Sequence, residues 1–278
     1  MEVRRAQYAG SWYPGEKESL NEAIKSYLAQ AGDLKADSVL NNLTVKPKAL
    51  IVPHAGYVYS APTAAAAFSS VKNASYSTVI VLAPSHRLPF DGVAVWDNGA
   101  FATPLGEILV DIDFISELKS ETSTVKSFKE PHLKEHSLEM ELPFLQYLLS
   151  DFKLVPLIIG GHKLKTVESL FQALDSVIGS RSDVLVVAST DLSHFHSSKE
   201  AEKLDGSAIS YIEQMDGTGL MEAATIGECE LCGLMPVATV LSMESFSQAR
   251  CVVANYTHSG KITGDNSSVV GYVSAVIV

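Results

Sequence analysis

The sequence predicts an α/β fold, a three-layer sandwich in which helices cover both faces of a central, mostly parallel or mixed β-sheet. Short apolar and β-branched runs end abruptly in polar residues, which is typical of strands that are buried on both faces. Longer segments between them carry apolar residues at helical spacing, and strands that alternate with helices indicate this fold class. No linker, internal repeat or shift in composition interrupts residues 1–278, so we expect a single domain.

Five segments have the composition of buried strands. They lie at 48–53, 78–84, 153–160, 183–190 and 268–278. The last of them, SVVGYVSAVIV, is expected to close the sheet. These apolar runs are well short of the roughly 20 residues that cross a bilayer, so we expect no membrane span.

Five other segments are predicted to be helices. They lie at 21–31, 60–71, 135–149, 165–178 and 235–246. In the second, Ser60 is expected to cap the helix and Pro62 to lie near its first turn, ahead of an alanine run of high helix propensity. In the third, Pro143 is expected to kink the helix or restart it, because proline lacks the N–H that a helix interior needs.

The composition argues against partners that carry clustered negative charge. The chain has 32 acidic and 21 basic residues, a net charge of −11, and no cluster of Lys and Arg. Binding to nucleic acid or to an anionic membrane surface is therefore not expected. The N-terminal stretch lacks the apolar core of a signal peptide, and three cysteines are too few for a disulfide framework. We therefore expect a cytoplasmic protein with reduced thiols.

Three histidines each follow a predicted strand. His54, His86 and His194 come shortly after the first, second and fourth of these strands. In open α/β sheets, ligands bind outside the carboxyl ends of the strands. If these strands are parallel neighbours, the three imidazoles meet at one edge of the sheet. A lone histidine is more often a surface or core residue than a ligand, but the repeated layout and the prolines in PHAGY and PSH favour a shared site.

A metal centre is the chemistry that fits this pattern. Neutral imidazole is a common ligand of Fe, Zn, Cu and Ni, and two histidines with one anionic ligand leave positions open for water, oxygen or substrate. The candidates for the anionic ligand are Asp191, Glu139, Glu141 and Cys232. Asp191, three residues before His194, could instead orient that histidine ring from outside the coordination shell.

Cys232 is attractive as a ligand because it comes just before the helix predicted at 235–246. A helix N-terminus and a nearby metal both lower the pKa of a thiol and favour the thiolate. The alternative is a small buried hydrophobe, the usual fate of a free cysteine. Cys229 and Cys232 also form a C-x-x-C, but without a second pair it carries little weight for structural zinc or for redox exchange.

Seven motifs, in order from about residue 4 to the end of the chain, resemble those of the Memo family. They are AGSWYPG, VPHAGYVYSAPTAAAAF, LAPSHRLPFDGVAV, EHSLEMELPFL, STDLSHFH, CGLMPVATVL and GDNSSVVGYVS. The family comprises homologues of the mediator of cell motility, which in prokaryotes are called AmmeMemoRadiSam system protein B. The motifs are highly specific as a set, although each alone is not.

The resemblance implies a fold related to class III extradiol dioxygenases, which are non-haem iron enzymes. It implies that His54, His86 and Cys232 hold one metal ion, with Fe(II) favoured over Cu or Zn, and that His194 is the catalytic acid/base. His136 and Asp191 fall in matching motifs and are expected beside the metal, in the substrate pocket or behind the ligands.

One departure from the ring-cleaving relatives limits what the resemblance implies about chemistry. Those enzymes use a carboxylate where this chain has Cys232, and a thiolate is a softer and oxidisable ligand. Ring cleavage therefore does not follow from a shared fold. The resemblance also implies a functional link to radical-SAM and AMMECR-type proteins.

Three functions are open on this basis. The first is a metal-dependent, dioxygenase-like oxidoreductase that acts on an unknown small substrate, with His194 moving the proton. The second is a non-catalytic module that binds a peptide or a small molecule in the same pocket. The third is a zinc-assisted hydrolase. The sequence contains none of the motifs GxSxG, P-loop or GxGxxG before a helix.

Overall fold

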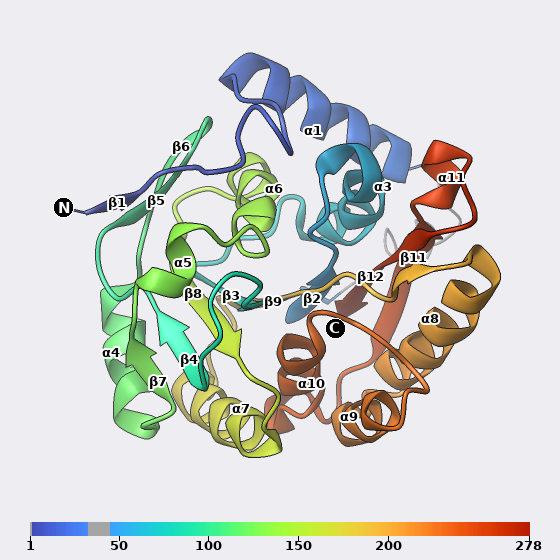
Figure 1. The fold of residues 1–278 in the computed structure, drawn as a ribbon. Helices are drawn as coiled ribbons and strands as arrows, with labels where there is room; N and C mark the ends of the chain where they lie inside the picture. The colour runs from blue at the N-terminus through green and yellow to red at the C-terminus, as the bar shows by residue number, and fades with distance from the viewer. Residues whose placement is uncertain (1, 33–44) are drawn as a thin grey trace.

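A mixed β-sheet forms the centre of the protein (Figure 1), seen in a computed structural model that describes residues 2–32 and 45–278. The strands follow the order β10 (His194–His196), β12 (Val269–Ile277), β2 (Ala49–Val52), β9 (Val184–Ser189), β3 (Thr78–Pro84), β8 (Lys153–Gly160), β4 (Gly92–Val95) and β7 (Val125–Ser127), and β11 (Cys251–His258) also pairs with β12. The neighbours β2, β9, β3 and β8 are parallel, whereas β12 is antiparallel to β2 and β4 is antiparallel to β8.

The parallel strands are buried because their side chains are apolar on both faces. Every residue of β2, β3 and β9 is buried, and β8 is buried after its first residue. These four strands and β12 confirm the five strand segments that the sequence predicts. Because β2, β9 and β3 are parallel neighbours, their carboxyl ends lie at the same edge of the sheet.

Helices cover both faces of the sheet, so the fold is an α/β sandwich (Figure 1). One layer contains α1 (Lys17–Ala31), α3 (Tyr57–Phe68) and α6 (Leu142–Leu148). The other contains α4 (Ile112–Glu121), α7 (Leu164–Ile178), α8 (Ser198–Glu213), α9 (Gly217–Thr225) and α10 (Leu234–Leu241). Two shorter helices are α5 (Glu130–Leu133) and α11 (Gly260–Thr263). No helix in the described residues combines the length and the apolarity needed to cross a membrane.

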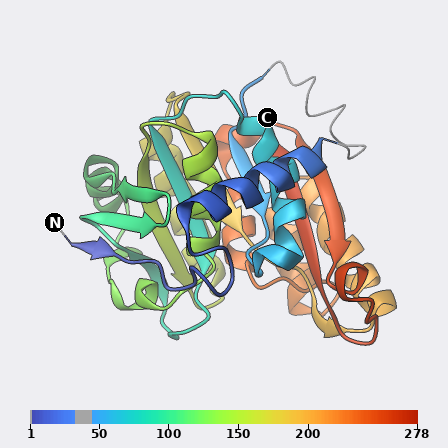
Figure 2. The same cartoon turned by 90° about the horizontal axis from the view of Figure 1, so that it is seen from above.

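A second, smaller sheet lies at the end of the molecule where the chain begins (Figure 2). It contains β1 (Val3–Arg4), β5 (Ala100–Thr103) and β6 (Gly106–Leu109). β1 is parallel to β5, and β5 is antiparallel to β6. The N-terminal segment then continues from this sheet to α1, which lies across α3 in the same view.

The start of α3 differs from the sequence prediction. The helix begins at Tyr57, so Ser60 does not cap it and Pro62 lies in its interior. The Ser60 hydroxyl donates instead to the carbonyl of Ala55, at 2.8 Å. The earlier start is supported by the N–H of Tyr57, which donates to the carbonyl of Trp12 at 2.9 Å. A contact between segments so far apart in the chain leaves no trace in the local sequence pattern.

Two other predicted helices are divided or shortened. The segment at 135–149 contains a 3-10 turn, Glu139–Glu141, and then α6, which has Pro143 in its first turn as a restart requires. The helix predicted at 235–246 ends at Leu241, because Met243 is extended with φ −67° and ψ 124°. Further 3-10 turns cover Ser69–Val71 and Glu244–Phe246.

The buried ring of His132, in α5, makes the fold sensitive to acid. Burial lowers the pKa of His132 to about 3, and its Nε2 lies 3.2 Å from the carbonyl oxygen of Ala94. The pKa of histidine in an unfolded chain is about 6.5. Between these two values the unfolded chain binds a proton that the folded protein does not, so this histidine lowers the stability as the pH falls through that range.

Replacement of His132 by phenylalanine is therefore expected to remove one acid-destabilising group. The difference in free energy of unfolding between variant and wild type should shift in favour of the variant by about 1.4 kcal/mol per pH unit below about pH 6. Urea unfolding of both proteins at a series of pH values down to about pH 4 measures this slope. A difference in free energy of unfolding that stays constant with pH would contradict the low pKa of His132 in the folded protein.

Candidate metal centre

The candidate site lies at the carboxyl ends of β2, β9 and β3. His54 lies two residues after β2, and His86 lies two residues after β3. His194 opens β10, five residues after the end of β9. Val52 and Ser189 are paired at the ends of β2 and β9, and β3 pairs with β9 on its other side. The loops that follow these strands therefore leave the sheet next to one another.

Three imidazoles meet at this edge. His54, His86 and His136 each offer a ring nitrogen, and these atoms all lie within 4.8 Å of one another. The ring centroids are 5.2 Å apart for His54 and His86, 5.3 Å for His54 and His136, and 4.6 Å for His86 and His136. Among residues 2–32 and 45–278, no other trio of His, Cys, Asp or Glu side chains meets the same distance condition. His136 thus joins the cluster itself.

His54 is held by groups on β9 and behind it. Its Nδ1 lies 2.7 Å from the hydroxyl of Ser189, which in turn lies 2.7 Å from Oε1 of Glu141. Burial and the charges of the neighbouring imidazoles lower the pKa of His54 well below its ordinary value, so its ring is neutral. With Nδ1 engaged by Ser189, Nε2 is the nitrogen that faces the cluster, and a neutral ring can ligate a metal.

His86 is held by Glu135, a buried carboxylate that the sequence analysis missed. Glu135 accepts the Nδ1–H of His86 at 2.9 Å and its backbone N–H at 2.6 Å. It also accepts the backbone N–H groups of His136 and Ser137, at 3.0 and 3.2 Å. Burial by itself raises the pKa of this carboxyl, but the hydrogen bonds and charge of His86 outweigh it and lower the pKa to about 2. An ionised carboxylate therefore orients His86, as metal-ligating histidines require.

The ring of His136 has a buried nitrogen without a partner. Its Nδ1 lies 3.2 Å from Glu135, but it forms no hydrogen bond with any group in the part of the chain that the structure describes. Burial lowers the pKa of His136 to about 4, so this ring is also neutral. On its other side the ring packs against Trp12, with centroids 4.6 Å apart. The Nδ1 nitrogen lies on the side of Glu135, whose Oε1 also binds Nδ1 of His86.

Cys232 contacts His54 but forms no trio with His54 and His86 that meets the 4.8 Å condition. Its Sγ lies 3.2 Å from Nε2 of His54, and it accepts the backbone N–H of Asp191 at 3.2 Å. Burial and the nearby charge of Asp191 raise the pKa of the Cys232 thiol, so the lowered pKa that the sequence favours would depend on a bound metal. A bound cation would have to displace this proton, as metals do at thiolate sites. Cys229 points elsewhere, with its Sγ 3.7 Å from the carbonyl oxygen of Leu220.

Asp191 supports His54 rather than His194. It accepts the backbone N–H of His54 at 2.9 Å, and burial raises its pKa to about 7. The carboxylate beside His194 belongs to Glu230, which accepts the backbone N–H of His194 at 3.2 Å and lies 4.0 Å from its Nδ1. Burial lowers the pKa of His194. Glu230 lies in the same loop as Cys232, so one loop supports both sides of the site.

The two other carboxylates considered as ligands have different roles. Glu139 is fully buried and pairs with Arg4, and it accepts the hydroxyl of Tyr13 at 2.7 Å and two backbone N–H groups. Glu141 lies behind Ser189, where burial raises its pKa well above the ordinary value and keeps it protonated. Neither carboxylate belongs to the imidazole cluster.

A cavity of about 480 Å³ opens in front of the imidazoles. His54, His86, His136, Asp191 and His194 form its polar part. The rest of its wall is largely apolar or aromatic and includes Trp12, Val58, Tyr59, Val270 and Tyr272. A mostly apolar cavity with a few convergent polar groups is the usual form of a small-molecule site.

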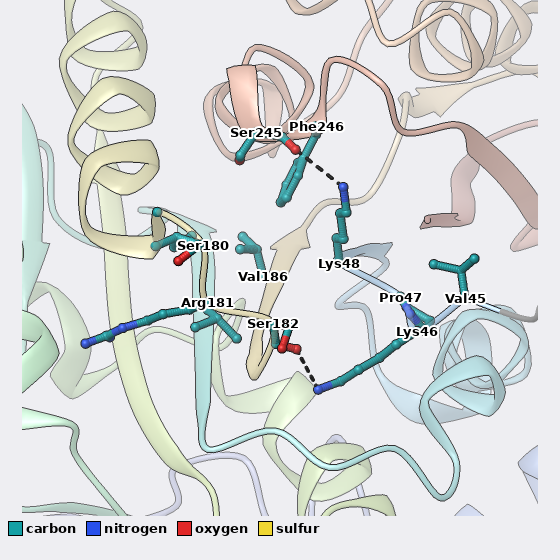
Figure 3. A pocket seen from close by; sticks show the side chains of 13 residues that line it. Val45, Lys46, Pro47, Lys48, Ser180, Arg181, Ser182, Val186, Ser245 and Phe246 are labelled. Carbon is teal, nitrogen blue, oxygen red and sulfur yellow. Dashed lines mark hydrogen bonds between the residues drawn. The ribbon is translucent and has the colours of Figure 1, made fainter.

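Another cavity, of about 360 Å³, lies at the opposite edge of the sheet, where β2 and β9 begin (Figure 3). Its lysines bind backbone carbonyls: Lys46 donates to Ser182 at 2.8 Å and Lys48 to Ser245 at 3.4 Å. Arg181 points away from the two lysines in the same view. The two lysines thus already have structural partners.

The residues of the imidazole cluster fit a transition metal. Bond lengths of roughly 2.0–2.1 Å to nitrogen and 2.3 Å to sulfur place two ligands of one ion about 3.1–3.6 Å apart. The 3.2 Å between Cys232 Sγ and His54 Nε2 falls in this range. Imidazole nitrogens and a polarizable sulfur are together the donor set of a soft or borderline divalent ion.

The fold and the site define a class of protein, an α/β sandwich with a histidine cluster at the carboxyl edge of its parallel strands. Within that class, the family model described as Memo-like protein matches residues 4–276, and the chain belongs to the Memo family.

Curated relatives match over almost their full length. A MEMO1 family protein of Sulfolobus acidocaldarius is 36% identical over 281 residues, which cover 98% of each chain. MEMO1 family proteins of Methanobrevibacter smithii and Thermotoga maritima are 34% and 32% identical, with 99% of each chain covered in both cases. The family resemblance predicted from the motifs is confirmed.

Proposed function

We propose that this protein binds one Fe(II) ion through His54, His86 and Cys232 and acts as an oxidoreductase on a small substrate. The observation that carries the proposal is the convergence of three imidazoles at the end of a cavity. The proposal includes a fold of the class III extradiol dioxygenase type. His136 would stand beside the ion and complete the wall that faces the substrate.

The choice of Cys232 as the third ligand rests on charge. A divalent ion held by two neutral rings is better compensated by a thiolate than by a third imidazole. The N–H of Asp191 donates to this sulfur, which stabilises the thiolate form once the proton is displaced. When bound, the ion would supply Lewis-acid and redox chemistry to oxygen and a small substrate.

The protein's own part in the reaction would fall to His194. Its ring borders the cavity, and burial lowers its pKa, so it is neutral near pH 7 and able to accept a proton. Glu230 binds the His194 backbone and the ring of His196, and its carboxylate, 4.0 Å from Nδ1 of His194, would stabilise the charge that His194 acquires. The apolar wall formed by Trp12 and Tyr272 would exclude water from the reacting atoms.

Replacement of Cys232 by serine is expected to reduce the bound metal clearly below one ion per chain, because serine is a poor ligand for a soft ion. Cys229→Ser is the matched control: it lies in the same loop, and its Sγ lies near Leu220, on a different side from the imidazoles. Elemental analysis of anaerobically purified proteins measures the occupancy. Equal occupancy in Cys232→Ser and wild type would remove the thiolate from the ligand set and leave His136 as the third ligand.

The same preparations test the chemistry. Iron, together with oxygen uptake in the presence of a reductant or a catechol, is the expected result. A zinc-loaded protein without oxygen uptake would favour a hydrolase over an oxidoreductase. Partner binding that persists in a His54→Ala and His86→Ala double variant, with no metal in the wild type, would favour a non-catalytic binding module.

A further inference from the structure

The turn next to His194 carries a strained and exposed aromatic residue. Phe195 has φ +64°, and 78% of its surface is exposed. The pairing of β10 with β12 shifts register between His194 and His196, so Phe195 is the extra residue of a β-bulge. A left-handed backbone is an outlier for a bulky residue and costs on the order of 1–3 kcal/mol. Bulges are common beside active sites, where they redirect a side chain.

Little burial compensates for this strain: the ring of Phe195 contacts the ring of His194, with centroids 5.8 Å apart, and is otherwise largely exposed. Burial of a phenylalanine side chain stabilises a protein by about 1.5–3 kcal/mol, and Phe195 forgoes most of that gain. Glycine would adopt the same backbone without strain, and it is the usual residue in bulges of this kind. A residue that costs stability on two counts, next to the candidate acid/base, is best explained by contact with a ligand.

Phe195 borders a cavity of about 340 Å³ that continues the candidate site. Tyr59, Val270 and Tyr272 line both this cavity and the cavity in front of the imidazoles. Val58, at the mouth of the imidazole cavity, is also exposed. The result is one groove with histidines at its inner end. Its outer part combines aromatic and aliphatic side chains with the polar side chains of Ser259, Thr263, Asp265 and Ser268.

The outer part of the groove is unsuited to an anionic ligand. Among the residues that line this part, the charged side chain is that of Asp265. This carboxylate accepts the N–H and the hydroxyl of Ser267, at 2.9 and 2.6 Å, and these bonds lower its pKa. A phosphate or carboxylate at this end would face a like charge, whereas an uncharged ring would find aromatic and aliphatic partners.

We infer that the substrate has two parts: a polar, metal-chelating head in the imidazole cavity and an uncharged, flat apolar body that extends along the groove to the face of Phe195. The inference of a chelating head depends on the proposed function, whereas the inference of an apolar body depends on the groove alone. Phe195 then determines specificity by stacking on the body, and the wall shared by the two cavities guides the connection between head and body.

The inference is tested with three probes of stated chemistry on the iron-loaded protein. Acetohydroxamic acid supplies a chelating head alone, biphenyl-4-hydroxamic acid adds a flat apolar body, and 4-phenylphenol supplies the body without a chelating head. Calorimetric titrations compare wild type with Phe195→Gly. Ile226→Gly is the matched control, because Ile226 is 71% exposed and lines neither cavity.

In wild type, the biphenyl compound is expected to bind about tenfold more tightly than acetohydroxamic acid, which corresponds to about 1.4 kcal/mol. Phe195→Gly should reduce this tenfold difference in affinity to near unity and should also weaken the binding of 4-phenylphenol. The affinity of Phe195→Gly for acetohydroxamic acid should stay at the wild-type value, and the Ile226→Gly control should bind all three compounds as wild type does. The melting temperature of Phe195→Gly should equal or exceed that of wild type, because strain is released.

Two results would overturn the inference. One is an unchanged ratio of the two hydroxamate affinities in Phe195→Gly, and the other is a large loss of thermal stability in this variant, which would mean that the phenyl ring stabilises the fold. The proposed function fails separately. If acetohydroxamic acid binds equally well to iron-loaded and metal-free protein, the metal site is wrong, and 4-phenylphenol still decides whether the groove holds an apolar body.

Discussion

Replacement of Arg4 by methionine is expected to lower the free energy of unfolding by about 3–5 kcal/mol, because it leaves a buried carboxylate without its cation. Arg4 is 3% exposed and pairs with Glu139, which is fully buried. Arg4 also donates to the carbonyls of His132 and Glu135, at 3.1 and 2.7 Å. Chemical unfolding of wild type and variant measures the loss.

The neighbouring Arg5 provides the control. It is exposed, and its replacement by methionine should change the stability by no more than about 0.5 kcal/mol. A double variant, Arg4→Met with Glu139→Gln, should recover part of the loss, because it removes the buried charge and keeps an acceptor for Tyr13. A loss in Arg4→Met no larger than in Arg5→Met would show that the buried pair contributes nothing to stability.

The effect of replacing Arg4 should extend to the candidate site. Glu139 binds the backbone N–H groups of Gln7 and Tyr8, so it anchors the segment that leads to Trp12. Trp12 packs against the ring of His136. Loss of the anchor would therefore loosen one wall of the imidazole cavity as well as the N-terminal sheet. A carboxylate that the sequence alone could read as a ligand acts here as a support for the wall.

The strands and their histidines could be predicted because their signal is local. A continuous run of apolar, β-branched residues is required wherever both faces of a strand are buried, and β2, β3 and β9 show it over their whole length. The position of His54 and His86 directly after such runs then follows from chain order. Right-handed crossovers through helices make strands of this kind parallel, so their ends share an edge.

The partners of the histidines could not be predicted in the same way. Glu135 binds His86 across 49 residues of chain, and Ser189 binds His54 across 135. Nothing in the sequence around Glu135 distinguishes it from Glu139 or Glu141, since all three lie in one short acidic stretch. Their roles differ because Glu135 is ionised beside an imidazole, Glu139 is paired with an arginine and Glu141 is kept protonated by burial.

The backbone conformation at Phe195 could not be predicted from the sequence either. Its left-handed conformation results from the register shift between β10 and β12, a contact between segments about 75 residues apart in the sequence. Phenylalanine has no propensity for this conformation, so local patterns predict an ordinary extended residue there. Places where a local rule is broken with little gain to the fold are places to look for function.

Replacement of Glu135 by glutamine is expected to weaken metal binding by about 10- to 100-fold, the usual effect of removing a carboxylate that orients a ligating histidine. The ionised carboxylate holds His86 at both its backbone N–H and its Nδ1, and it makes the ring a better donor. Glutamine keeps the size of the side chain but offers one acceptor oxygen and no charge. Competition with a chromophoric chelator measures the affinity.

Glu141→Gln is the matched control, because Glu141 is a second buried glutamate, which reaches the other histidine through Ser189. It contacts Ser189, whose hydroxyl lies beside Nδ1 of His54. Burial keeps Glu141 protonated, so glutamine replaces it at nearly constant charge and shape and should change the metal affinity less than about threefold. Equal losses in the two variants would mean that shape, not charge, supports the site. No loss in Glu135→Gln would mean that His86 is not a ligand.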